Sequence, residues 1–229
     1  MINPSGSSAS RRKPDQRPRE VTAPEALLRY EREARERGAT LLCGVDEAGR
    51  GPLAGPVVAA AVILPAGCFL PGVRDSKELT ARQRTRLYAE VVRCAIDFSV
   101  GICDAEEIDE VNILRATWRA MARAVAGLRP RPDFALVDGL PVQGLPTPHQ
   151  AIVDGDAKVH AIAAASIIAK VTRDRIMAAY DALYPHYGFA EHKGYGTPAH
   201  LRALSEHGPC PLHRRSFAPV LASTARLFG

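Results

Sequence analysis

Short apolar runs separated by stretches with helical spacing constrain the fold more than any other feature of this sequence. Residues 41–46 and 134–138 form two such runs that end in aspartate, and residues 56–64 form a third that begins with proline and is rich in β-branched residues at its ends. Runs of this length with such boundaries are typical of buried strands. Residues 98–103 and 150–153 are two further strand candidates.

Segments with helical spacing lie between these strands and dominate after them. Helices are predicted over residues 24–37, 79–97 with Thr80 as the cap, 104–127 with a break near Asn112, 158–184 and 198–207. Strands interleaved with helices predict an α/β fold that has a mixed central sheet flanked by helices and a small helical C-terminal appendage.

Composition divides the chain into three parts. We expect a basic, largely disordered extension over residues 1–37, a catalytic domain over 38–184, and a C-terminal loop and helical appendage over 185–229. These parts carry different charge: residues 1–37 have a net charge of +3, residues 38–156 of −3 and residues 157–229 of +5. A site that gathers carboxylates beside a surface that attracts a polyanion fits this pattern, although chance explains the charges alone equally well.

The composition also restricts the class of protein. Hydrophobic residues make up 46% and charged residues 24% of the chain, a balance typical of globular proteins. No apolar run approaches the roughly 20 residues needed to cross a bilayer, and no apolar signal segment follows the basic N-terminal residues. The five cysteines include no CxxC pair, which disfavours a zinc ribbon and a disulfide framework. We therefore expect a cytoplasmic monomer that does not contact membranes.

Carboxylates follow several of the predicted strands. Asp46 and Glu47 end the first strand, Asp138 ends a later one, and Asp154 and Asp156 precede the longest helix. Each of these acids, taken alone, is explained as well by a turn or a helix cap. Together they would repel one another unless cations neutralised them, and hard oxygen ligands suit Mg²⁺ or Mn²⁺. Two such cations can activate water against a phosphodiester, but the sequence does not establish that the acids converge.

A specific resemblance begins at residues 44–57, which read GVDEAGRGPLAGPV. Further motifs follow in order: DSK at 75–77, DG at 138–139, GD at 155–156, AASIIAKVTRD at 164–174, HKGYGT at 192–197 and RRSF at 214–217. Over about residues 38–220 the chain resembles the ribonuclease HII family. The resemblance implies a ribonuclease H-like fold and an endoribonuclease. Such an enzyme hydrolyses the RNA strand of RNA–DNA hybrids, cuts 5′ of ribonucleotides embedded in duplex DNA, and leaves 5′-phosphomonoesters.

The resemblance also implies roles for individual positions. The family's four catalytic and metal-binding acids correspond to Asp46, Glu47, Asp138 and Asp156, which would hold two Mg²⁺ or Mn²⁺ ions. Asp154 competes with Asp156, and the Gly-Asp position of the motif favours Asp156. Two further elements correspond to substrate-binding elements of the family: Gly49, Arg50 and Gly51 to the loop that reads the ribose 2′-hydroxyl, and Tyr195 to a tyrosine that stacks on the next sugar.

Basic and polar side chains supply further candidates for substrate binding. Ser166, Lys170 and Arg173 share one face of the longest predicted helix, which fits contacts with phosphates. Lys77 is a weaker candidate, as are Lys193, Arg214 and Arg215. The alternative for these charges is a solvated surface, and the alternative for Tyr195 is a loop aromatic packed against the protein body.

Three other classes compete with this interpretation. A ribonuclease HIII-like enzyme usually has another residue between the two glycines of the loop, so Arg50 disfavours it. A catalytically inactive hybrid-binding protein of the same fold should have lost one of the acids, and all four are present. The Gly-Arg-Gly loop and Tyr195 disfavour a transposase or resolvase. The role of residues 1–37 and the relative activity on single ribonucleotides and long hybrids stay open.

Overall fold

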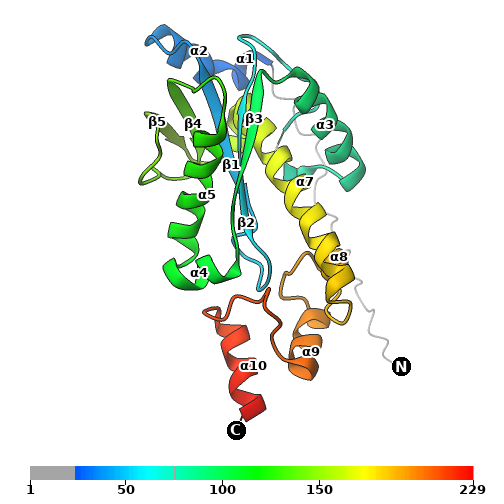
Figure 1. Cartoon of the computed structure of the whole chain (residues 1–229). Helices are drawn as coiled ribbons and strands as arrows, with labels where there is room; N and C mark the ends of the chain where they lie inside the picture. Colours follow the sequence, from blue (N-terminus) through cyan, green and yellow to red (C-terminus); the bar gives the residue numbers. More distant parts are fainter. Residues whose placement is uncertain (1–23, 75, 229) are drawn as a thin grey trace, which may run out of the picture.

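A five-stranded mixed sheet forms the centre of the protein, in the strand order β3-β2-β1-β4-β5. The computed structural model describes residues 24–74 and 76–228, which Figure 1 shows in colour. The strands are β1 (Leu42–Ala48), β2 (Val57–Ile63), β3 (Asp97–Cys103), β4 (Phe134–Asp138) and β5 (His149–Ile152). Each corresponds to one of the strands predicted from the sequence. β1, β2 and β3 pair antiparallel, whereas β4 pairs parallel to both β1 and β5.

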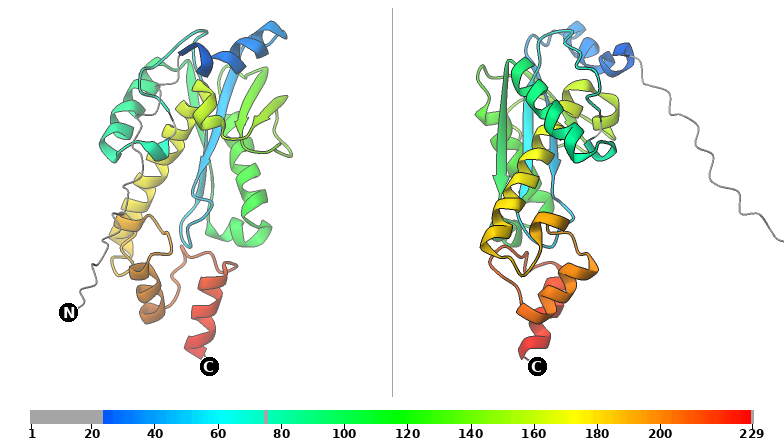
Figure 2. Two further views of the ribbon diagram at one scale, coloured as in Figure 1. Left: turned by 180° about the vertical axis from the view of Figure 1, so that it is seen from behind. Right: turned by 90° about the vertical axis from the view of Figure 1, so that its right-hand side faces the viewer.

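Helices cover both faces of the sheet. α7 (His160–Leu183) and α3 (Ala81–Cys94) lie on one face, and α4 (Ala105–Val111) and α5 (Ile113–Gly127) lie on the other, as Figure 2 shows from behind. Successive residues of a strand point to opposite faces, so Ala59 and Ala61 pack against the α5 side while Ala60 and Val62 pack against the α7 side. The α/β class with a mixed sheet is thereby confirmed.

Two strand glycines allow these helices to approach the sheet closely. A Cβ on Gly44 of β1 would overlap the backbone of Ala161 in α7. A Cβ on Gly101 of β3 would overlap the backbone of Ala120 in α5. The close approach of α7 matters for function, because α7 runs along the end of β1 that carries the acids.

Side-chain caps mark two of the predicted helix boundaries, the start of α3 at Thr80 and the break between α4 and α5 at Asn112. Thr80 caps α3 by accepting a hydrogen bond from the backbone N–H of Gln83, and the Gln83 side chain completes a capping box. Asn112 separates α4 from α5 with a φ of 72°, and its side chain accepts hydrogen bonds from the N–H groups of Leu114 and Arg115. The break predicted near Asn112 is therefore confirmed.

Smaller elements complete the described part of the chain. They are α1 (Pro24–Leu27), α2 (Arg29–Glu36), the 3₁₀ helix η1 (Ser76–Glu78), α6 (Gly155–Lys158), α8 (Phe189–His192), α9 (Pro198–His207) and α10 (Ala218–Phe228). α1 and α2 lie at one end of the molecule, and α9 and α10 lie at the other (Figure 1). None of the helices within the described residues is long and apolar enough to cross a membrane.

The N-terminal extension expected over residues 1–37 contains a folded part. In α2, Glu31 and Ala34 are buried, and Ala34 packs with Leu42 and Ile162 of the folded body. The predicted helix at 24–37 thus forms as α1 and α2 and docks against the sheet end. The disorder expected for residues 1–23 lies outside the described residues.

Candidate active site

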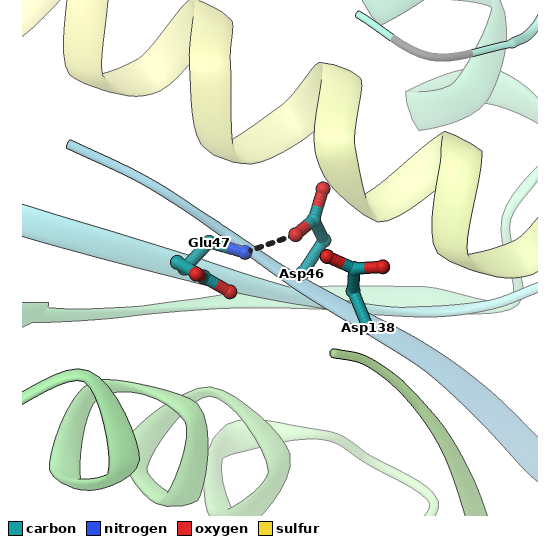
Figure 3. A group of neighbouring side chains, drawn as sticks. All are labelled: Asp46, Glu47 and Asp138. Carbon is teal, nitrogen blue, oxygen red and sulfur yellow. Dashed lines mark hydrogen bonds between the residues drawn. The ribbon is translucent and has the colours of Figure 1, made fainter. Parts of the chain in front are cut away.

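Three carboxylates come together where β1 and β4 end side by side. The parallel register aligns Val45 with Val137, which places Asp46 and Asp138 at the same level of neighbouring strands. Asp46, Glu47 and Asp138 each offer an oxygen, and these oxygens all lie within 4.8 Å of one another (Figure 3). The convergence expected from the strand ends is therefore present for three of the four predicted acids.

Burial and mutual repulsion make this cluster costly without a counter-charge. The pKa of Asp46 is raised well above its ordinary value, first by burial and then by the charges of Glu47 and Asp138. Burial also raises the pKa of Glu47, although Arg50 opposes the shift. The pKa of Asp138 is raised by burial and by the charge of Asp156. The charged forms of these groups are therefore under-compensated by the protein itself.

A divalent cation fits this donor set. All three side chains offer carboxylate oxygens, which are the ligands that Mg²⁺ and Mn²⁺ prefer. The spacing of the oxygens allows them to surround one position, and the raised pKa values indicate an unmet demand for positive charge. Asp46 is only 4% exposed, so it could reach a cation only from inside the depression that the cluster lines.

Asp156 lies beside the three converging acids and is paired with a lysine. It is buried in α6, and its Oδ2 lies 3.0 Å from Nζ of Lys77. It also lies close enough to Asp138 to raise the pKa of that carboxyl. The backbone N–H of Gly155 donates a 2.6 Å hydrogen bond to Asp138 Oδ1, which ties the start of α6 to the end of β4.

The same segment separates Asp156 from its competitor Asp154. The Asp154 side chain is 75% exposed and pairs with Lys158 across 3.6 Å. Asp154 has a φ of 55°, and its left-handed conformation turns the chain before α6. The geometry thus favours Asp156 over Asp154 as the fourth acid.

The Gly49-Arg50-Gly51 loop and Tyr195 line the same depression as the acids. A Cβ on Gly51 would lie 3.7 Å from Cε1 of Tyr195, so the loop and the ring face each other closely. The Tyr195 side chain is 46% exposed, unlike an aromatic packed into a core. The Arg50 side chain is exposed and lies 3.3 Å from Glu47 Oε1. The loop, the ring and the acids therefore form one continuous surface.

Arg173 borders the same depression as Lys170 but is almost wholly buried. It is 1% exposed, and its guanidinium donates to the backbone carbonyls of Pro56, Ala54 and Lys193 at 2.9–3.1 Å. All three nitrogens are engaged in these bonds, so the side chain braces the chain rather than meeting a ligand. Helical spacing correctly places Arg173 on the face of α7 shared with Ser166, but the loop after β1 covers that end of the face.

Lys170, Ser166 and Lys77 lie at the wall of the depression. Lys170 Nζ lies 2.7 Å from Asp174 Oδ1, one turn along α7. The Ser166 hydroxyl donates to Ser76 Oγ at 2.8 Å, which joins α7 to η1, the element that also carries Lys77. These contacts fix one wall of the site opposite the Gly49–Gly51 loop.

Arg214 has a larger structural role than its sequence context predicts. It is fully buried and donates to the carbonyls of Gly49, Arg50 and Gly55 at 2.5, 2.8 and 3.0 Å. Burial, together with the charge of Arg173, lowers its pKa to about 9. No periodicity indicates such a role, and the only signal in the sequence is the RRSF motif at 214–217. Together, Arg173 and Arg214 hold residues 49–56 against the C-terminal segment.

Fold and site together define a class: nucleases of the ribonuclease H-like fold, in which clustered carboxylates sit at the ends of adjacent central strands. The sequence profile of the family described as Ribonuclease HII matches residues 43–220. The chain is 56% identical over 196 residues to a ribonuclease HII of Geobacillus kaustophilus, covering 86% of this chain and 75% of that protein. A ribonuclease HII of Geobacter metallireducens is 53% identical over 195 residues, covering 85% of this chain and 92% of that protein.

Solved structures agree with the sequence comparison. The crystal structure of ribonuclease H2 from Pyrococcus horikoshii superposes with a TM-score of 0.72 at 30% identity, covering 82% of this chain and 99% of that one. The chain belongs to the ribonuclease HII family. The match to this family sets aside the HIII-like and transposase alternatives.

Proposed function

We propose that Asp46, Glu47, Asp138 and Asp156 form the catalytic centre of this ribonuclease HII. The chain is an endoribonuclease that acts on RNA–DNA hybrids, and the finer proposal is that it also cuts 5′ of single ribonucleotides in duplex DNA. The observation that carries the assignment is the convergence of three carboxylates on strand ends, with Asp156 adjacent. Membership of the family supports the reaction type.

The carboxylates would hold two divalent cations, Mg²⁺ or Mn²⁺. When bound, these cations supply an activated water and compensate the charge on the leaving oxygen. The protein's own contribution is to hold the acids rigidly. Asp46 is fixed by β1 and accepts a 2.7 Å hydrogen bond from the Glu47 N–H, and Asp138 is held by the Gly155 N–H at 2.6 Å. Such pre-organisation avoids reorganisation at the moment of reaction.

Recognition of the ribonucleotide falls to the loop and the ring that face each other across the site. The 2′-hydroxyl is the group by which a protein distinguishes RNA from DNA. Gly51 is exposed, whereas Gly49 is buried against the Arg173 side chain, and Arg50 lies close to Glu47. The half-exposed ring of Tyr195 lies next to this loop, 3.7 Å from the position of a Cβ on Gly51. There it could stack on the neighbouring sugar.

The duplex would be positioned by Lys170, Ser166 and Lys77 on the opposite wall. Phosphate contacts of this kind add affinity and fix register without reading sequence. Arg173 acts indirectly in this proposal, because its guanidinium is engaged with backbone carbonyls. The net charge of +5 on residues 157–229 supports binding of a polyanion by this part of the chain.

A cleavage assay tests the proposal directly. The substrates are a DNA duplex with one ribonucleotide, an RNA–DNA hybrid and an all-DNA duplex, each labelled at the 5′ end, with Mg²⁺, with Mn²⁺ and with chelator. We expect a cut 5′ of the ribonucleotide only when a divalent cation is present, and no cut in the all-DNA duplex. Binding of the hybrid without any cation-dependent cleavage would instead identify an inactive hybrid-binding protein.

A further inference from the structure

Two cysteines that play no part in the active site lie in contact on the α3 side of the sheet. Cys68 belongs to the segment between β2 and η1, and Cys94 is the last residue of α3. Their Sγ atoms are 3.1 Å apart, although the residues are 26 positions apart in the sequence. Both side chains are partly exposed, so a small reagent can reach them.

The other cysteines are in different surroundings. Cys43 and Cys103 are fully buried, and Cys210 is 8% exposed. Cys210 Sγ contacts His213 Nδ1 at 3.2 Å, and Cys103 Sγ accepts from Arg123 at 3.2 Å. Among the described residues, therefore, only Cys68 and Cys94 combine mutual contact with access from solvent.

We propose that Cys68 and Cys94 form a reversible disulfide when the protein meets a low-molecular-weight disulfide such as oxidised glutathione. A disulfide has an S–S length of about 2.05 Å, so the two sulfurs need to approach by only about 1 Å from their present separation. The proposal concerns a covalent modification and stands independently of the ribonuclease activity.

The reaction balances as two successive thiol–disulfide exchanges. One cysteine loses its proton and attacks the reagent, which forms a mixed disulfide and releases one reduced thiol. The second cysteine loses its proton and attacks the protein sulfur of that mixed disulfide, which forms the Cys68–Cys94 bond and releases the second thiol. Two cysteine thiols are oxidised, and one molecule of reagent is reduced to two thiols.

The rate of the first exchange and the extent of conversion to the internal disulfide depend on different features of the two cysteines. Burial and the Cys94 neighbour raise the pKa of Cys68 to about 12, which makes its thiolate scarce at neutral pH and slows its exchange. Once one cysteine carries the mixed disulfide, the other sulfur is already in contact, so ring closure should outrun release. We therefore expect slow entry into the reaction and almost complete conversion to the internal bond.

The bond would close a ring that contains one wall of the active site. η1 lies inside this ring, and its Ser76 accepts from Ser166 while its Lys77 pairs with Asp156. The ring also contains α3, which packs against α7 through Leu87 and Val91. A covalent link between its two ends would restrict the unfolded chain and hold this wall against α7.

The test is incubation of the full-length protein with oxidised glutathione at pH 8.5, followed by intact mass measurement and peptide mapping after alkylation of remaining thiols under denaturing conditions. We expect a mass loss of two hydrogen atoms, a single linked pair of peptides containing Cys68 and Cys94, and full reversal by dithiothreitol. The melting temperature should rise by about 7–14 °C, the range that follows from closing a ring of this size in a chain of this length.

Cys68→Ser and Cys94→Ser provide matched controls, because each leaves one partner and all three remaining cysteines in place. Each variant should retain a glutathione adduct on the remaining cysteine and show no rise in melting temperature. A wild-type protein that accumulates stable glutathione adducts at Cys68 or Cys94 would overturn the proposal. A linked pair that involves another cysteine would also count against it. A Cys68–Cys94 bond without any change in melting temperature would support the disulfide and refute the stabilisation expected from closing the ring.

Discussion

Replacing Arg214 by lysine tests whether the C-terminal segment holds in place the loop that carries Gly49, Arg50 and Gly51. The guanidinium of Arg214 is fully buried and serves three carbonyls of this loop at once. Lysine keeps the charge and the approximate length, but a single ammonium group lacks the planar fork that meets three acceptors in these directions. The substitution therefore removes geometry rather than charge.

The magnitude follows from the contacts that are lost. Hydrogen bonds to a charged group contribute about 1.5–3 kcal/mol each, and buried carbonyls left without partners add a penalty. If lysine keeps one of the three bonds, the free energy of unfolding should fall by about 3 kcal/mol or somewhat more. For a chain of this size such a loss lowers the melting temperature by about 6–12 °C.

Activity should fall by more than stability explains, because the loop forms one side of the proposed substrate site. A displacement of about 1 Å at such a position can cost about 100-fold in rate. We expect Arg214→Lys to raise KM for a duplex with one ribonucleotide and to lower kcat/KM by about 10–100-fold, measured well below the melting temperature of the variant. Arg215→Lys is the matched control, because the Arg215 side chain is exposed and only its backbone N–H is bonded, to Asp109.

Two results would refute this reasoning. An Arg214→Lys protein with the wild-type melting temperature would show that the three hydrogen bonds add nothing to stability. A destabilised variant that keeps the wild-type KM and cleavage position at low temperature would show that the loop holds its conformation without Arg214. In that case Arg214 would be a structural residue without influence on substrate binding.

Three further predictions address single side chains. Asp138→Asn should abolish cation-dependent hydrolysis yet raise the melting temperature in chelator, because the amide oxygen can still accept from Gly155 while one repelling charge is gone; turnover at the wild-type rate would disprove the assignment. Burial raises the pKa of Glu31 to about 7, so its contribution to stability is present below about pH 4.5 and is lost as the pH rises through 7. Urea unfolding should therefore show that the free energy of unfolding of Glu31→Gln, relative to that of the wild type, rises by about 1–3 kcal/mol between pH 4.5 and pH 8. A difference between the two proteins that does not depend on pH would contradict this. Tyr195→Ala should lower kcat/KM on a single ribonucleotide about tenfold, since stacking on nucleic acid contributes about 1–3 kcal/mol, whereas Tyr195→Phe should keep most of the activity; equal losses in both variants would argue for the hydroxyl instead of the ring.

The sequence predicted the strands and the break at Asn112 because local rules decide them. Apolar runs with turn residues at their ends report buried strands, and an asparagine with a positive φ can close one helix and cap the next. The convergence of Asp46 with Asp138 was foreseeable only as an inference from strand ends. The parallel pairing of β1 with β4 produces it, and no local pattern specifies which strands become neighbours.

The buried positions of Arg173 and Arg214 could not be predicted from local sequence patterns. Helical spacing identifies the face of α7 on which Arg173 lies, but it contains no information about which segment covers that face. The covering segment is residues 49–56, which also receive hydrogen bonds from a residue more than 150 positions away. Basic side chains close to a predicted anion site are therefore ambiguous from sequence. Burial separates those that brace the backbone from those that can meet a phosphate.

The proposed catalytic acids and the proposed recognition loop have separate structural supports in this protein. The acids are positioned by strand pairing within the sheet, and Asp138 is further fixed by the start of α6. Residues 49–56, which include the Gly49–Gly51 loop, are held instead by two arginines: Arg173 of α7 bonds to Ala54 and Pro56, and Arg214 before α10 bonds to Gly49, Arg50 and Gly55. Because none of the described side chains of α9 and α10 lines the depression that Asp46, Glu47 and Asp138 share, damage to the C-terminal segment should first impair the choice and placement of the ribonucleotide. Loss of cation binding should require changes to β1, β4 or α6.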